Sequence, residues 1–114
     1  MELTTALLSR FVGGQLEIHN PKRGYLYCGE IKATAVEGDM IKVRFTWLAT
    51  QKRGEWVSDP ELDYSASAMI YSASDIGEGR IAMHTSSVGE MVVFFPLGGS
   101  RLDPAKVRGL DLAA

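Results

Sequence analysis

The fold of this protein is decided by residues 25–49, which read YLYCGEIKATAVEGDMIKVRFTWLA. Two long runs of mixed apolar and polar side chains, residues 25–36 and 40–49, surround a short turn signal at Gly38 and Asp39. Alternation with a period of two is typical of β-strands, and two such runs around a glycine turn predict a β-hairpin. We therefore expect the centre of the chain to be a pair of long antiparallel strands.

The register of this hairpin follows from its second strand, because one face of that strand is clearly apolar. Facing residues of an antiparallel pair lie on the same side of the sheet. A two-residue turn at Gly38 and Asp39 would set Phe45 opposite Lys32. An apolar and a charged side chain would then lie on the same face of the sheet. A three-residue loop over residues 37–39 avoids this mixture and is also a common hairpin length. It predicts four facing pairs: Ala35 with Ile41, Ala33 with Val43, Ile31 with Phe45, and Gly29 with Trp47.

Shorter elements flank the hairpin. Apolar spacing over residues 3–12, followed by two glycines, predicts a short amphipathic helix. Strands are predicted at residues 15–19, 55–58, 68–72, 80–85 and 91–95. Asp103 before Pro104 predicts a short helical turn near the C-terminus, over residues 103–109. This order predicts one mainly β domain over residues 1–114, a small barrel or a rolled antiparallel sheet with short helical pieces at both ends.

The first part of the chain also resembles a known class of small barrels. Residues 24–31, GYLYCGEI, followed by residues 38–45, GDMIKVRF, look like the first hairpin of SH3-like and Tudor-like barrels. The resemblance covers residues 15–49 and implies an SH3-like barrel core. A barrel of this kind does not by itself define a function.

Composition and motifs narrow the class of protein. The chain has 114 residues, of which 46% are hydrophobic and 23% charged, as in ordinary globular domains. No apolar run reaches the roughly 18 residues of a spanning helix, and the N-terminus lacks the basic start of a signal peptide. A lone Cys28 forms no intramolecular disulfide and supplies no zinc site. We expect a cytoplasmic protein without cofactor, metal or membrane contact.

Charge is unevenly distributed along the chain. The net charge is −2, from 12 basic and 14 acidic residues. Residues 10–53 hold eight basic and four acidic side chains, whereas residues 54–79 hold six acidic and no basic ones. The expected register puts three basic residues on the outward face of the hairpin, with Lys32 opposite Arg44. These three residues are Lys32, Lys42 and Arg44. They would bind the phosphates if the protein were a nucleic-acid-associated barrel, which is the alternative hypothesis, although no stacking aromatic ring is interleaved with them.

Aromatic residues gather on the other face of the hairpin. Tyr25 and Tyr27 share this face with Phe45 and Trp47, and Gly29 opposite Trp47 leaves space above the backbone. One interpretation is that Trp47 folds over Gly29 to fill the core. The other is a partly open pocket whose acidic rim, residues 55–63, favours a basic or cationic ligand. The residues of this pocket would be Tyr25, Tyr27, Trp47, Trp56 and Tyr64.

Catalytic motifs are missing. The chain has no Gly-x-Ser-x-Gly elbow, Walker loop or His-Glu-x-x-His helix. His19 and His84 are its only imidazoles, so a small enzyme that uses one of them is the third hypothesis. The favoured hypothesis is a non-catalytic binding or assembly module with a protein or peptide partner.

Residues 91–95 form a strand that is apolar on both faces. Such a strand is either buried on both sides or part of an oligomer interface. The simplest closed assembly is a homodimer. We expect it to form through Met91, Val93 and Phe95.

Overall fold

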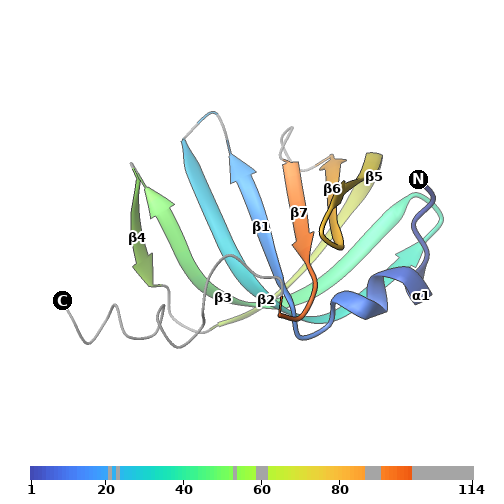
Figure 1. Ribbon diagram of the computed structural model, residues 1–114, viewed down its shortest axis with the longest axis horizontal. Helices are drawn as coiled ribbons and strands as arrows, with labels where there is room; N and C mark the ends of the chain where they lie inside the picture. Colours follow the sequence, from blue (N-terminus) through green and yellow to red (C-terminus); the bar gives the residue numbers. More distant parts are fainter. Residues whose placement is uncertain (21, 23, 53, 59–61, 87–90, 99–114) are drawn as a thin grey trace.

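The computed structural model describes residues 1–20, 22, 24–52, 54–58, 62–86 and 91–98, which form a closed six-stranded antiparallel barrel with a short helix at one end (Figure 1). The elements are α1 (Thr5–Leu8), the 3-10 turn η1 (Ser9–Phe11), β1 (Gln15–Asn20), β2 (Tyr25–Glu37), β3 (Met40–Lys52), β4 (Glu55–Ser58), β5 (Asp63–Gly77), β6 (Arg80–Thr85) and β7 (Met91–Phe95). The predicted small, mainly β barrel is confirmed. The helical turn predicted at residues 103–109 lies outside the described residues.

The barrel closes through the hairpin. Its strands follow the order β2, β1, β7, β6, β5, β3, and β3 pairs again with β2. Every pairing is antiparallel. β4 extends the sheet beyond the barrel by pairing with residues 49–52 of β3. Closure gives each barrel strand a neighbour on both sides over part of its length, which leaves less strand edge exposed.

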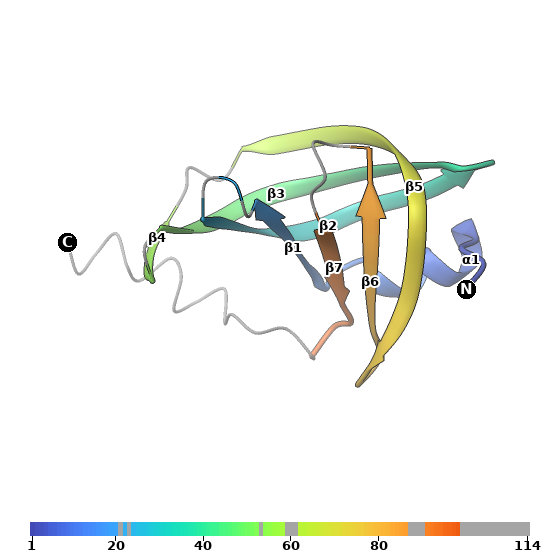
Figure 2. The same ribbon diagram turned by 90° about the horizontal axis from the view of Figure 1, so that it is seen from above.

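β5 is much longer than the strand predicted at residues 68–72. Its first half pairs with β3 and its second half with β6, so it curves around one side of the barrel (Figure 2). Alanine has a low β preference, which hides this strand in the sequence. Ala66 and Ala68 nevertheless pack against the core, while Ser65 and Ser67 are exposed on the outside.

The register of the hairpin is partly as expected. Glu37 faces Met40, so the turn has two residues, and the predicted partners of Ala33 and Ala35 are wrong: they face Arg44 and Lys42. A β-bulge between Ile31 and Ala33 then shifts the ladder by one residue. The bulge absorbs Lys32, which restores the two remaining predicted pairs. Ile31 faces Phe45, and Gly29 faces Trp47.

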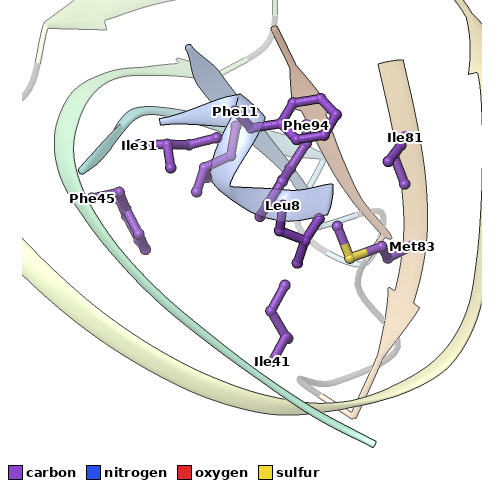
Figure 3. Close-up of a cluster of buried hydrophobic side chains, with 9 residues drawn as sticks. Leu8, Phe11, Ile31, Ile41, Phe45, Ile81, Met83 and Phe94 are labelled. Carbon is purple, nitrogen blue, oxygen red and sulfur yellow. The ribbon is translucent and has the colours of Figure 1, made fainter. Parts of the chain in front are cut away.

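The N-terminal segment closes one end of the barrel. Leu8 of α1 and Phe11 of η1 are buried among the inward side chains, and the ring of Phe11 lies 5.6 Å from that of Phe94 (Figure 3). The Thr5 hydroxyl accepts a hydrogen bond from the Val36 N–H at 2.9 Å and donates one to the Val36 carbonyl at 3.2 Å. The helix thereby supplies hydrogen-bond partners for the Val36 backbone groups, in the last part of β2 that extends past β1.

The helices of this structure are short. In the described part of the chain, none has both the length and the apolar character that crossing a membrane requires.

Candidate functional site: the aromatic mouth

The end of the barrel opposite α1 carries a group of aromatic rings. β2 begins at this end with Tyr25 and reaches α1 near its last residues. The register brings Tyr27 and Trp47 onto the inner face of the hairpin, and β5 adds Tyr64 opposite Phe45. We call four of these residues the aromatic mouth: Tyr25, Tyr27, Trp47 and Tyr64.

The rings of the aromatic mouth form a continuous chain. The ring centroids of Tyr25 and Tyr27 lie 6.1 Å apart, those of Tyr27 and Trp47 5.7 Å, and those of Trp47 and Tyr64 5.8 Å. These are edge-to-face or tilted contacts, each worth about 0.5–1.5 kcal/mol beyond its buried area. Tyr64 is 51% exposed, so the chain of rings ends in solvent.

Phe45 forms the base of the aromatic mouth. Its ring is buried and lies 4.7 Å from Trp47 and 5.6 Å from Tyr64 between centroids. A Cβ atom at Gly29 would come within 2.7 Å of Cδ2 of Phe45. The expectation that Trp47 covers Gly29 is therefore wrong, since Phe45 takes that place. Trp47 stands beside it, half-buried, in contact with the core on one side.

Charged groups border the aromatic mouth. Lys52 Nζ lies 5.1 Å from the ring centroid of Tyr25, a cation–π contact within the chain. Glu55 faces Lys52 across the β3–β4 ladder. Asp63 precedes Tyr64 on β5, but its carboxylate lies on the outer face of the sheet, where it accepts a hydrogen bond of 2.7 Å from the Thr46 hydroxyl. Both carboxylates belong to exposed residues, while Asp59 and Glu61 of the predicted acidic rim lie outside the described residues.

Trp56 does not join the aromatic mouth. It packs against Cys28, Leu48 and Ala49, which lie on the other face of the sheet. The alternation of β4 explains this position, because Val57 faces Thr50 and thereby shares the face of Tyr27. Four of the five predicted aromatic residues come together, and Trp56 is directed away from them.

The sequence patterns missed two exposed apolar residues near the aromatic mouth. Val57 is 53% exposed and Leu62 64% exposed. Leu62 is tied to the site because its carbonyl accepts a hydrogen bond of 3.2 Å from the Trp47 N–H. Val57 lies in the short strand β4 and Leu62 directly before β5, in a part of the chain where the sequence shows no clear period.

The three basic residues of the hairpin lie on the outer face of the barrel. The predicted pair of Lys32 and Arg44 is wrong, because the bulge removes Lys32 from the ladder and Arg44 faces Ala33. Lys32 Nζ instead lies 3.2 Å from Glu30, and Lys42 Nζ lies 3.0 Å from Glu37. Two of the three cations thus have a carboxylate beside them.

The two histidines also face outward. Both stand opposite Met91, His19 on β1 and His84 on β6. His19 Nε2 lies 3.4 Å from the buried carboxylate of Glu17. The strand β7 lies between β1 and β6, so the two histidines stand on strands that are not neighbours. Within the described residues, no three His, Cys, Asp or Glu side chains are placed to hold a metal ion.

β7 lies between β1 and β6 in the barrel wall. Val93 and Phe95 are 5% and 4% exposed within a single chain, and Met91 is half-buried. Of the two alternatives for this strand, burial on both faces is therefore observed. The homodimer stays a prediction.

Comparisons with protein-family models, with curated proteins and with solved structures find no match to this chain. The small β-barrel is shown by the structure itself. The finer resemblance of residues 15–49 to SH3-like and Tudor-like barrels stays a prediction.

Proposed function

We propose that this protein is a non-catalytic binding module whose aromatic mouth recognises a cationic group, the side chain of a lysine or arginine on a protein partner. The observation that carries the proposal is the convergence of aromatic rings from β2, β3 and β5 at the end of the barrel opposite α1. Ring faces attract ammonium and guanidinium groups. Lys52 over Tyr25 supplies an example within the chain.

The surroundings support a cationic ligand. Cation–π contacts contribute about 0.5–1 kcal/mol at exposed sites and about 2 kcal/mol or more when desolvated. Glu55 stands near the Tyr25 end of the chain of rings, and its negative charge adds a longer-range attraction. The rings project from paired strands, so little side-chain freedom is lost when a ligand binds.

A titration followed by NMR tests the proposal, because the chain has two tryptophans, one in the aromatic mouth and one outside it. The probes are tetramethylammonium and a blocked lysine peptide. We expect the indole N–H signal of Trp47 to move on titration and that of Trp56 to stay. Equal movement of both signals, or of neither, would contradict the proposal.

A matched pair of tyrosine variants sharpens this test. Tyr64 belongs to the aromatic mouth. Tyr71 lies farther along the same strand, β5, close to the first residues of the chain, and is 68% exposed. We expect Tyr64→Ala to weaken binding of the lysine peptide about two- to fivefold, the equivalent of one exposed cation–π contact. Tyr71→Ala should bind like the parent protein. Equal losses in both variants would place the binding site elsewhere.

A further inference from the structure

The lumen of the barrel contains a cavity that adjoins the aromatic mouth. Its volume is about 70 Å³, and its walls come from β1, β3, β5, β6 and β7. About 10–15 Å³ of such space holds one water molecule, so the cavity admits a group of several heavy atoms. Phe45 links the two sites, because it lines the cavity and also contacts Trp47 and Tyr64.

Small residues on β5 create this space. Interior positions of small barrels are usually filled by side chains. At the α1 end of this barrel, Leu8 and Phe11 fill the interior. Nearer the aromatic mouth, β5 contributes only the methyl groups of Ala66 and Ala68, which face Val43 and Ile41 of β3.

The cavity is open to solvent. Residues that face the lumen of a closed barrel are normally buried, yet several inward-facing residues along this cavity are only half-buried. They come from four strands, so the opening is a property of the lumen and not of one displaced side chain. The half-buried residues are Ile18, Val43, Ala66, Ala68 and Val92.

The lining selects an uncharged, apolar occupant. None of the described residues that line the cavity is charged, and most carry aliphatic or aromatic side chains. An ammonium group would lose its hydration in such a place without finding a partner. An aliphatic group gains by leaving water. The cavity and the ring faces of the aromatic mouth therefore suit different parts of one ligand.

We propose that the lumen accepts a branched aliphatic side chain of the same partner peptide whose cationic side chain binds at the aromatic mouth. This inference rests on the proposed function. Alternate side chains of an extended peptide point to the same side and are separated by about 6–7 Å. Phe45 lines the cavity and lies 5.6 Å from Tyr64 between ring centroids, so the two sites are neighbours within the reach of alternate side chains of one peptide. The recognised sequence is then a basic residue with leucine, isoleucine or valine two positions away.

Three blocked peptides test the inference: Lys-Ser-Leu, Leu-Ser-Lys and Lys-Ser-Ser. We expect one of the two leucine peptides to bind roughly tenfold or more tightly than Lys-Ser-Ser, since leucine leaves water when it enters the lumen. Equal affinities of all three peptides would overturn the lumen inference and leave the proposed function intact. Binding by none of the peptides would overturn both.

Filling the cavity gives a matched control. Ala68→Leu adds a side chain inside the lumen, whereas Ser65→Leu adds the same side chain on the outer face of the same strand. We expect Ala68→Leu to remove the preference for leucine while it keeps the affinity for Lys-Ser-Ser. Ser65→Leu should keep both. If Ala68→Leu fails to fold, Ala66→Val fills part of the same space, and an unchanged leucine preference in that variant would count against the lumen.

Benzene separates the peptide from a free small molecule as the occupant. We expect benzene to shift the methyl NMR signals of Ile18, Val92 and Met83, which line the cavity, and the leucine peptide to displace it. Benzene binding without displacement by the leucine peptide would overturn the inference in favour of a free apolar ligand.

Discussion

The ring of Phe45 lies over Gly29 so closely that no side chain fits at position 29. A Cβ atom there would meet Cδ2 of Phe45 at 2.7 Å and the Thr46 carbonyl at 3.2 Å. This close approach lets Phe45 turn into the core. Trp47, two residues further along β3, stays at the surface of the aromatic mouth. A missing side chain on β2 thus determines how deep the base of the site lies.

Gly29→Ala should therefore disturb both stability and site. The added methyl group forces Phe45 out of its position, and we expect the free energy of unfolding to fall by about 1–3 kcal/mol. Urea unfolding followed by circular dichroism measures the change. Ala35→Ser, on the outward face of the same strand, is the control and should stay within about 0.5 kcal/mol of the parent. A Gly29→Ala protein as stable as the parent would show that Phe45 moves aside freely.

Replacing Trp47 or Phe45 by alanine should lower the free energy of unfolding by different amounts. Phe45 is buried, and Phe45→Ala should lower the free energy of unfolding by about 3–5 kcal/mol. Trp47 is half-buried, so Trp47→Ala should cost less, while binding of the lysine peptide disappears. Urea unfolding and peptide titration of both variants check this. A cost for Trp47→Ala that equals that of Phe45→Ala, with binding retained, would make Trp47 a core residue only.

The attachment of α1 to β2 depends on one hydroxyl group. Thr5→Val removes both hydrogen bonds to Val36 with little change in shape, and each is worth about 0.5–1.5 kcal/mol. We expect a lower free energy of unfolding and faster hydrogen exchange of the Val36 amide. Thr5→Ser keeps the hydroxyl group and should protect this amide as the parent does. Similar exchange in both variants would mean that packing of Leu8 and Phe11 alone holds the helix.

Local sequence patterns predict the strands of this barrel well where the alternation is strong. β2, β3, β6 and β7 lie where alternation or a short apolar run places them. β5 was predicted too short, because its alternating serines and alanines carry little β preference. The two bulges of the β2–β3 ladder were missed as well. A bulge bends a strand to fit the curvature of the closed sheet, and that curvature depends on pairings between residues far apart in sequence.

The aromatic mouth was predictable only in part, for the same reason. Tyr25, Tyr27 and Trp47 belong to one hairpin, so their common face follows from the local register. Tyr64 reaches the site through the pairing of β5 with β3, which no local pattern reveals. Trp56 is on the opposite face because the turn before β4 determines which of its alternate residues faces inward. Lengthening or shortening that turn by one residue would move Trp56 to the other face of the sheet.

The basic residues on the outer face give the last prediction, on nucleic acid. We expect no binding of a short DNA or RNA at an ionic strength of roughly 0.15 M, because the net charge is −2 and Lys32 and Lys42 already lie beside carboxylates. Fluorescence anisotropy of a labelled oligonucleotide at this and at a roughly tenfold lower ionic strength measures it. Arg44→Glu should leave binding of the lysine peptide unchanged, since Arg44 faces outward beside Ala33 and Ser65. Oligonucleotide binding that falls steeply with salt and is lost in Arg44→Glu would instead make the outer face of the hairpin the functional surface.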